Sequence, residues 1–372
     1  MIEEELKLTP EQFGQFWKYI ENSMVTDVDY NGHSLWITDQ RKGCYKVDED
    51  ITEQFIVQFT HDVSNVVNKQ FNQVHNTLEA DSDNLRITLV NEAAAPSGTS
   101  ICIRKSPPVV RNTIKGMVSS GYCSEEVLNL LINCVRAKMN IVFGGEPGTG
   151  KTEAAKFFQQ FIRANEKVIT IEDVLEMHYS MIYPDRNCTE LRISKDFTYQ
   201  DAIKVCLRNN PTWLMLSEAR STEVKFLMEQ WSTGVHGFST IHMEDIHNLP
   251  DRILNMMERV ADPERMENRI YRAVNVGILI RRVKGEDGSI RRYMEQVGFY
   301  VRENHKNRVY MIVDNGEVVS RELPEEIKKK FREAEIQDPF SCECMDEFLR
   351  KEKERNERQD REENETREEN KE

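Results

Sequence analysis

Glycines, a lysine and a threonine at fixed spacing form the clearest chemical pattern in this sequence. The stretch GGEPGTGKTE, residues 144–153, fits G-x-x-x-x-G-K-[ST]. Glycines let backbone N–H groups turn toward a phosphate, the lysine reaches the β- and γ-phosphates, and the hydroxyl can bind Mg²⁺. The pattern predicts a nucleoside triphosphate site with Mg²⁺. Its candidate binding residues are Gly145, Pro147, Gly148, Thr149, Gly150, Lys151, Thr152 and Glu153.

The residues around this loop supply the context that the motif requires. NIVF predicts a strand leading in, and KTEAAKFFQQFIRA a helix leading out. Two further apolar runs end in carboxylates, VITIED at Glu172 and Asp173, and WLMLSEA at Glu218. Ligands of open α/β sheets lie at the carboxyl ends of strands, so these groups could position Mg²⁺ or polarise water. Either end alone could equally be an ordinary solvated strand terminus.

The second half of the chain alternates short apolar runs with helical stretches, which predicts a mainly parallel sheet. The runs RRYMEQVGFYV and NRVYMIVDNGEVV predict antiparallel strands after it. Upstream, LTPEQFGQFWKYIENSM predicts a helix with Thr9 as N-cap and Pro10 at its first position. A hairpin at SLWITDQRKGCYKV, a helix at ITEQFIVQFTHDVSNVVNKQF, and strands at NLRITLVNE and TSICIRK complete a small α/β unit.

We therefore predict an α/β protein with two domains and a tail. Residues 1–112 form a small N-terminal α/β domain with a linker near 106–112, where Pro107 and Pro108 restrict the backbone. Residues 113–335 form the domain that carries the glycine-rich loop. Residues 336–372 form a charged tail, expected to be disordered or helical.

Charge and composition narrow the class of protein. The formal net charge is −14, from 50 Lys and Arg against 64 Asp and Glu, which does not favour non-specific attraction to nucleic acid or anionic lipid. No run of eighteen apolar residues occurs, and MIEEELKLTP lacks the order of a signal peptide. Eight scattered cysteines without a CxxC pair predict reduced thiols in a cytoplasmic protein.

Several segments together resemble the secretion-superfamily ATPases, the hexameric motors of type II secretion, type IV pili and type IV conjugative secretion. Beside the phosphate loop, ITIEDVLEMH resembles their Asp box, LRNNPTWLMLSEAR their Walker B segment and STGVHGFSTIH their His box. VTDVDYNG and SGTSICIRK resemble the N-terminal domain of the conjugation and Tad-pilus branch. The resemblance covers roughly residues 25–300 and implies a RecA-like P-loop ATPase domain after the linker.

The resemblance also implies catalytic roles. Glu218 would activate the attacking water and, with Thr152, help to hold Mg²⁺. Glu172 would act as a second acidic group, and His242 would sense the γ-phosphate. An arginine would stabilise transition-state charge, often from a neighbouring subunit. The candidate arginines are Arg104, Arg192, Arg208 and Arg220.

Three positions depart from the family pattern. Thr212 stands where an aspartate is usual, and Ser217 where a glycine is usual. Val235 occupies the slot of the first His-box histidine, with His236 one place later. His236 either replaces that histidine or is a surface residue, and the sequence leaves both readings open.

By resemblance, the protein is an ATP-hydrolysing homo-hexamer at the inner face of the cell membrane, where it powers a type IV secretion or conjugation machine through inner-membrane components. The absence of a tetracysteine zinc module fits the type II branch poorly. A Tad or type IV pilus assembly ATPase is the first alternative, and a nucleotide-binding scaffold subunit with weak turnover is the second. A helicase-like ATPase is disfavoured by the acidic balance and the lack of an aromatic-basic cluster, so no direct sequence-specific nucleic-acid binding is expected.

Overall fold

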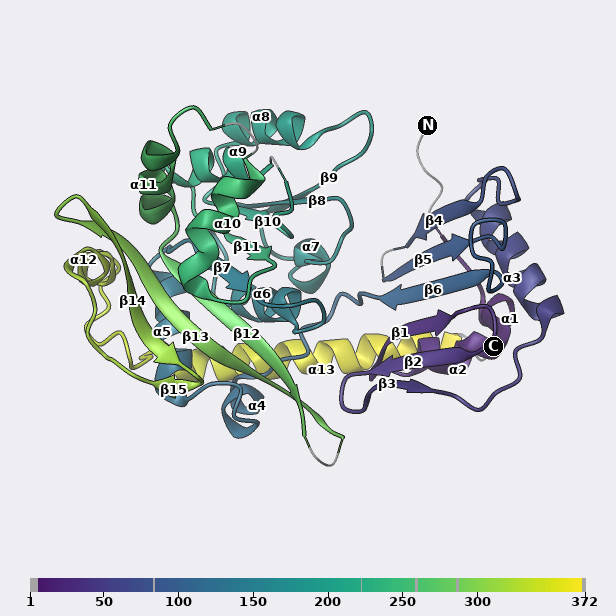
Figure 1. Ribbon diagram of the computed structural model, residues 1–372. Helices are drawn as coiled ribbons and strands as arrows, with labels where there is room; N and C mark the ends of the chain where they lie inside the picture. The colour runs from purple at the N-terminus through teal and green to yellow at the C-terminus, as the bar shows by residue number, and fades with distance from the viewer. Residues whose placement is uncertain (1–5, 83, 222, 258–259, 286–287, 370–372) are drawn as a thin grey trace. The chain divides into compact units, whose positions relative to one another are not determined.

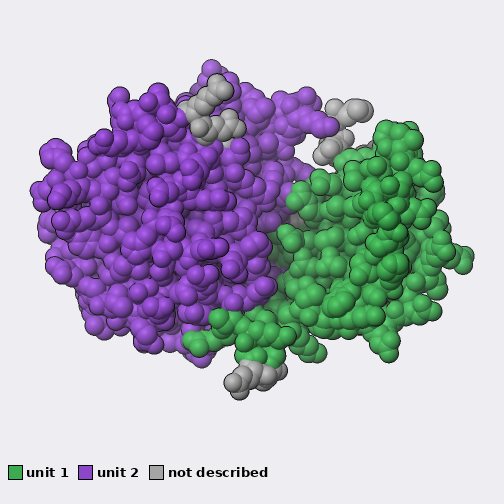
Figure 2. Space-filling model, in the orientation of Figure 1, with its two compact units in different colours: residues 1–108, 283–291 green, residues 109–282, 292–372 purple. Residues whose placement is uncertain are grey.

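The computed structural model describes residues 6–82, 84–221, 223–257, 260–285 and 288–369. Its chain divides into two compact units, coloured green and purple in Figure 2. Unit 1 comprises Met1–Pro108 and Val283–Arg291, and unit 2 comprises Val109–Arg282 and Arg292–Glu372. The chain therefore crosses between the units after Pro108 and again at both ends of residues 283–291.

Unit 1 is built on a six-stranded sheet with the order β3-β2-β1-β6-β5-β4, in which the neighbouring strands run antiparallel (Figure 1). Its strands are β1 Val25–Tyr30, β2 Leu35–Asp39, β3 Gly43–Lys46, β4 Thr77–Asp81, β5 Leu85–Val90 and β6 Ser100–Lys105. The predicted hairpin is confirmed as β2 and β3, and two of the predicted strands as β5 and β6. Strands β1 and β4 were not predicted.

The helices of unit 1 bury aromatic side chains. They are α1 Pro10–Phe13, a 3-10 turn at Gly14–Phe16, α2 Trp17–Glu21 and α3 Glu53–Val66. Thr9 is the N-cap of α1 with Pro10 at its first position, as the sequence predicts, and Thr9 also forms a capping box with Gln12. Phe16 and Phe59 are fully buried, with ring centroids 5.2 Å apart.

Unit 2 contains a nine-stranded sheet with the order β15-β14-β13-β12-β7-β11-β10-β8-β9. The strands from β12 through β7, β11, β10 and β8 to β9 pair in parallel, while β13–β14 and β14–β15 pair antiparallel. The α/β class and the mainly parallel sheet are thus confirmed. The strands are β7 Ile141–Gly144, β8 Val168–Glu172, β9 Cys188–Arg192, β10 Trp213–Leu216, β11 Phe238–Ile241, β12 Val276–Lys284, β13 Ile290–Glu303, β14 Lys306–Asp314 and β15 Glu317–Val318.

The sheet differs from the sequence prediction in two places. The run NRVYMIVDNGEVV forms two strands, β14 and β15, because Asn315 and Gly316 between them have φ angles of 51° and 80° and make a tight turn. Strand β9, at the edge of the sheet, was not predicted. Its burial alternates only weakly, so it has little hydrophobic signal.

Both faces of the parallel sheet are covered, which explains why β7, β8, β10 and β11 are buried along their whole length. Along β7, Ile141 and Phe143 join one hydrophobic core with α5 and α6, while Val142 joins a second core with α8 to α11. The helices of unit 2 are α4 Ile114–Ser119, α5 Glu125–Arg136, α6 Lys151–Gln159, α7 Tyr179–Ile182, α8 Tyr199–Asn209, α9 Glu223–Trp231, a 3-10 turn Ile246–Asn248, α10 Leu249–Met256, α11 Pro263–Ala273, α12 Glu325–Glu333 and α13 Met345–Glu369.

The C-terminal segment begins inside the core of unit 2. Ile336 and Cys342 are buried in the same core as α5 and α6, and the ring of Phe348 lies 4.9 Å from that of Phe161. Helix α13 then continues to Glu369, and residues 370–372 lie outside the described part of the chain. Within the described residues, none of the helices combines the length and apolar character needed to cross a bilayer.

Candidate nucleotide site

The glycine-rich loop joins the carboxyl end of β7 to the first turn of α6. Gly145, Gly148 and Gly150 have φ angles of 145°, 75° and 90°, which disfavour any side chain. A Cβ atom at Gly145 would also lie 2.5 Å from the carbonyl oxygen of Ile280 and 2.7 Å from Oγ1 of Thr149. Glycine is therefore required in this loop on steric grounds as well as for phosphate binding.

Lys151 is the first residue of α6, and its side chain lies back along the loop. Its ammonium donates to the carbonyl oxygens of Gly145 at 3.1 Å and Glu146 at 3.0 Å, and lies 3.2 Å from Nδ1 of His242. Only 8% of the residue is exposed. Burial lowers the pKa of Lys151 to about 8, although two nearby carboxylates act in the opposite sense. The loop thus holds a buried cation that is mostly protonated at neutral pH.

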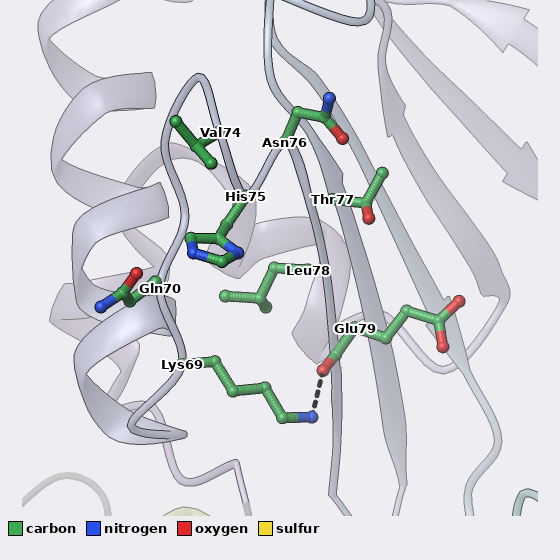
Figure 3. A pocket seen from close by; sticks show the side chains of 8 residues that line it. All are labelled: Lys69, Gln70, Val74, His75, Asn76, Thr77, Leu78 and Glu79. Atoms are coloured by element: carbon green, nitrogen blue, oxygen red, sulfur yellow. Dashed lines mark hydrogen bonds between the residues drawn. The ribbon is translucent and has the colours of Figure 1, made fainter.

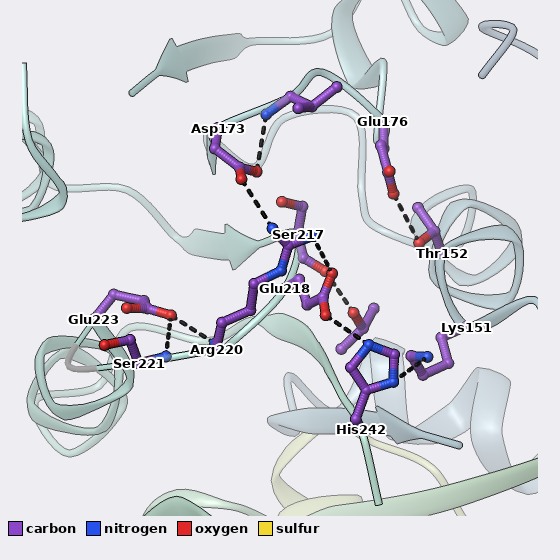
Figure 4. A network of polar contacts seen from close by, with 12 residues as sticks. Lys151, Thr152, Asp173, Glu176, Ser217, Glu218, Arg220, Ser221, Glu223 and His242 are labelled. Atoms are coloured by element: carbon purple, nitrogen blue, oxygen red, sulfur yellow. Dashed lines mark hydrogen bonds and ion pairs between the residues drawn. The ribbon is translucent and has the colours of Figure 1, made fainter. Parts of the chain in front are cut away.

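His242, Glu218 and Arg220 form a chain of polar contacts beside Lys151 (Figure 4). Nε2 of His242 lies 2.9 Å from Oε1 of Glu218. Arg220 donates to the other oxygen of Glu218 at 2.6 Å and to Asp173 at 3.1 Å. An ammonium can only donate and a carboxylate can only accept, so Nδ1 of His242 lies beside a donor and its Nε2 donates to Glu218. The contacts therefore join the phosphate loop to the ends of β10 and β11.

The carboxyl of Glu218 is largely buried yet ionised. Burial alone would raise its pKa, but the hydrogen bond and charge of Arg220, followed by the charges of His242 and Lys151, hold the pKa below its usual value. The pKa of Arg220 is raised in return, chiefly by the hydrogen bond to Glu218. A charged carboxylate therefore faces the lysine of the phosphate loop.

The turn that carries Glu218 is fixed on both sides. Glu223, the first residue of α9, accepts the backbone N–H groups of Arg220 and of the next residue at 2.6 and 2.7 Å. On the other side, Oγ1 of Thr240 in β11 donates to the carbonyl oxygen of Ser217 at 2.7 Å. These bonds hold the backbone of the turn in place without contacting the carboxylate of Glu218.

Thr152 contacts a carboxylate that the sequence analysis did not single out. Its Oγ1 donates to Oε2 of Glu176 at 3.1 Å (Figure 4). Glu176 lies four residues after Glu172, within the segment ITIEDVLEMH, so the signal was present in a motif that had already been recognised. A hydroxyl beside a carboxylate offers the oxygen ligands that suit Mg²⁺.

Glu172 braces the backbone at the end of β8. It is fully buried, and its Oε2 accepts the N–H groups of Glu176 and Met177 at 2.8 and 3.0 Å. Burial raises its pKa to about 7 against the effect of these two bonds. The two bonds that it accepts give it a part in shaping the loop that carries Glu176, and its role as a second acidic group stays a prediction.

The four candidate arginines occupy different places. Arg220 belongs to the network described above. Arg192 is exposed at the end of β9, in register with Glu172 of β8. Arg208 is exposed in the last turn of α8, which leads to the amino end of β10, the edge of the sheet opposite Glu218.

Arg104 lies on β6 in unit 1, where its Nε is 3.0 Å from Oδ1 of Asp27. Its side chain is 62% exposed. A contribution of Arg104 to a nucleotide site stays a prediction.

His236 and His242 lie at opposite ends of β11. His242 directly follows Ile241, which is in register with Gly144 at the phosphate loop. His236 precedes the strand and packs beside Trp213, the first residue of β10, with ring centroids 6.0 Å apart. At extended spacing, six residues separate the two histidines by roughly 20 Å. The structure therefore keeps His236 away from the phosphate loop of its own chain.

The substitution at Thr212 lies at the same far edge as His236. Its N–H donates to the carbonyl oxygen of Lys167 at 2.9 Å, at the amino end of β8. Burial lowers the pKa of His236 to about 4, and the positive charges of Lys330 and Lys138 act in the same direction. His236 is thus neutral at physiological pH. The departures at Thr212 and Val235 lie outside the network around Glu218, whereas Ser217 directly precedes Glu218.

Glu153, the last residue of the motif, contacts the end of the predicted linker, at residues that belong to unit 2. Its carboxylate lies 3.7 Å from Arg111 and 3.5 Å from the fully buried Lys156, and its carbonyl oxygen accepts from Asn112 at 3.5 Å. The first turn of α6 is therefore tied to the chain that leads into unit 2.

The loop fits a nucleoside triphosphate with Mg²⁺. Backbone N–H groups at the start of α6, the ammonium of Lys151 and three left-handed glycines make a site for phosphate. Among the described residues, no three His, Cys, Asp or Glu side chains gather as a metal site of their own. Mg²⁺ commonly binds through one or two protein oxygens together with phosphate oxygens and water, a role that the Thr152–Glu176 pair suits.

Comparisons with known proteins agree with this geometry. Residues 50–333 match the family described as type II/IV secretion system protein. An uncharacterized protein of Bacillus anthracis is 30% identical over 263 residues, which cover 70% of this chain and 59% of that protein. The type IV secretion system protein VirB11 of Brucella suis is 28% identical over 184 residues, 41% of this chain and 50% of that protein. The chain thus spans 59% of the length of the first relative and 50% of the second.

Solved structures share the fold. The ATPase DotB of Legionella pneumophila superposes with a TM-score of 0.59 at 15% identity, covering 82% of this chain and 84% of DotB. The pilus retraction motor PilT gives a TM-score of 0.52 at 18% identity, covering 92% and 90%. An N-terminal domain followed by a RecA-like domain is confirmed. Because the family match extends over well more than half of its residues, this chain belongs to the type II/IV secretion system protein family.

Proposed function

We propose that this protein is an ATPase motor that hydrolyses ATP to power a type IV secretion or conjugation machine, by substrate translocation or pilus biogenesis. The observation that carries the proposal is the chain of contacts from Lys151 through His242 to Glu218, which links a phosphate loop to an ionised carboxylate on a neighbouring strand (Figure 4). Membership of the secretion family and the similarity to VirB11 of Brucella suis support the type IV assignment.

Each residue of the network has a part in hydrolysis. The ammonium of Lys151 leaves the loop carbonyls to bind the β- and γ-phosphates. Glu218, held ionised by Arg220, orients the attacking water and accepts its proton. The hydroxyl of Thr152, with Glu218 acting directly or through water, would hold Mg²⁺, which when bound neutralises charge on the phosphate oxygens.

His242 connects the lysine that binds phosphate to the carboxylate that orients water. Its Nδ1 is near Lys151 and its Nε2 donates to Glu218, so movement of the lysine toward a phosphate alters the hydrogen bonding of the carboxylate. This is a physical form of the γ-phosphate sensing expected of the His box. Arg220 already contacts Glu218, so it can also stabilise charge that develops beside that carboxylate.

We further propose that the motor is a homo-hexamer on the cytoplasmic face of the inner membrane, in contact with inner-membrane components of its machine. An acidic net charge of −14 supports protein partners over direct sequence-specific binding of nucleic acid. Arg104 is the candidate that a neighbouring subunit would supply to a nucleotide.

The test separates binding from turnover in the full-length protein. ATP affinity is measured by calorimetry, and phosphate release is followed with and without EDTA. The proposal expects Mg²⁺-dependent phosphate release that Lys151→Ala abolishes. Tight binding without release would identify a scaffold subunit, and loss of pili with normal conjugation in a deletion strain would favour the pilus assembly alternative.

A further inference from the structure

Three arginines of the neighbouring strands β12 and β13 lie against the phosphate loop. Arg281 and Arg282 are near the end of β12, and Arg292 is near the start of β13. All three belong to unit 2. Arg292 is 144 residues from the loop glycine that it contacts, so sequence spacing does not indicate the contact.

Arg292 contacts the loop at Gly148. Its Nε and Nη2 each lie 3.4 Å from the carbonyl oxygen of Gly148. A Cβ atom at Gly150 would lie 3.6 Å from its Cδ. The side chain therefore spans the two glycines whose φ angles are 75° and 90°.

The contacts of Arg292 with the carbonyl oxygen of Gly148 also constrain the N–H on the opposite side of the same peptide, which belongs to Thr149. In a planar trans peptide, the carbonyl of Gly148 and the N–H of Thr149 point in opposite directions. That N–H makes a 3.4 Å bond to the carbonyl oxygen of Glu146, a weak bond that a phosphate oxygen can replace. Holding the carbonyl in place thus keeps the N–H directed into the loop.

Arg282 places a second cation at the same glycine. A Cβ atom at Gly148 would lie 3.0 Å from its Nη1. Burial lowers the pKa of Arg292, and the charge of Arg282 acts in the same direction. Two like charges held side by side repel each other, and a bound polyphosphate relieves that repulsion.

Arg281 contacts the beginning of the loop. It pairs with Glu295 on β13, donates to the carbonyl oxygen of Glu244 at 2.8 Å and lies 3.8 Å from the carboxylate of Glu146. Residues of β12 and β13 therefore contact the loop at two places: Arg281 at Glu146 and Arg292 at Gly148.

We propose that Arg292 is a positioning residue for nucleotide binding, which sets the Gly148–Thr149 peptide of the phosphate loop, and that Arg282 adds long-range attraction for the phosphate chain. This inference rests on the proposed function, because it assigns further residues to the same nucleotide site. It predicts different effects for the two arginines.

The test compares Arg292→Ala, Arg292→Lys, Arg292→Gln and Arg282→Ala in the full-length protein. Arg321→Ala is the control, because Arg321 is 65% exposed in the same unit and pairs with Glu126 at 2.7 Å. Dissociation constants for ATP and ADP are measured at low and high salt, with KM and kcat alongside. Thermal unfolding without nucleotide reports whether each variant folds.

Arg292→Ala should raise Kd and KM about tenfold, as expected for losing a hydrogen bond to a charged group. Its kcat should change little, because the loop binds ground state and transition state alike. Arg292→Lys should recover part of the affinity, and the loss should persist at high salt. Arg282→Ala should weaken binding at low salt only, because charge without contact is screened.

Two results would overturn the inference. One is an unchanged Kd for both nucleotides in Arg292→Ala and Arg292→Gln. The other is a loss that Arg321→Ala reproduces or that matches a loss of folded protein. If the wild-type protein itself binds no ATP, the proposed function fails instead, so the two failures are distinguishable.

Discussion

The imidazole of His242 donates from Nε2 to Glu218 across 2.9 Å, while its Nδ1 lies 3.2 Å from the ammonium of Lys151. One side chain at the end of β11 therefore joins the phosphate loop after β7 to the carboxylate after β10. Parallel strands bring their carboxyl ends to one edge of the sheet, which is why residues 91 positions apart can touch.

The first prediction concerns Glu218. Glu218→Gln keeps the shape of the side chain but removes its charge, so it should retain ATP and slow phosphate release by about a hundredfold or more. Single-turnover phosphate release and calorimetric ATP affinity check this. Glu229→Gln, at an exposed position on α9, is the matched control. Wild-type turnover in Glu218→Gln would remove this residue from catalysis.

The second prediction concerns the pH dependence of nucleotide affinity. Lys151 has a pKa lowered to about 8 by burial, so raising the pH through that value removes the positive charge that contacts phosphate. ATP affinity should therefore hold near neutral pH and fall above about pH 8. Lys151→Arg keeps its charge at any of these values and should flatten the profile. A fall of equal size in both proteins would assign the effect to another group.

The third prediction separates the two histidines of the His box. His242→Ala removes the link between Lys151 and Glu218 and should lower turnover with little change in ATP affinity. His236→Ala lies at the opposite edge of the sheet, so its turnover should match the wild type. Steady-state kinetics of both variants tests this prediction. Impaired turnover in His236→Ala alone would show that His236, and not His242, has the sensing role.

The fourth prediction concerns assembly and Arg104. If neighbouring subunits complete the site, specific activity should rise with protein concentration as rings form, and Arg104→Ala should lose about a thousandfold in rate. Light scattering alongside ATPase assays measures both. Asp27→Asn removes the ion-pair partner of Arg104 and leaves the arginine in place, so it should keep its activity. Concentration-independent turnover by a monomer would contradict the ring. Equal losses of activity in Arg104→Ala and Asp27→Asn would show that Arg104 acts only through its ion pair with Asp27.

Local features of this protein could be predicted from the sequence because their physical cause lies within a few residues. The glycine, lysine and threonine spacing, the strand before it and the helix after it all act over short distances. The same holds for the cap at Thr9 and Pro10. The positions of Glu218 and His242 at strand ends also followed from apolar runs bounded by polar residues.

Tertiary structure decided which of the remaining polar groups contact the loop. Glu176 contacts Thr152 because Glu172 accepts the backbone N–H of Glu176 and so turns the chain at the end of β8. Arg292 contacts Gly148 because its strand β13 lies beside β12, which pairs with β7, a neighbour relation that no sequence spacing encodes. Charged residues are common at any surface, so their type alone cannot select a partner. Only the order of strands in the sheet determines which charges meet at the phosphate loop.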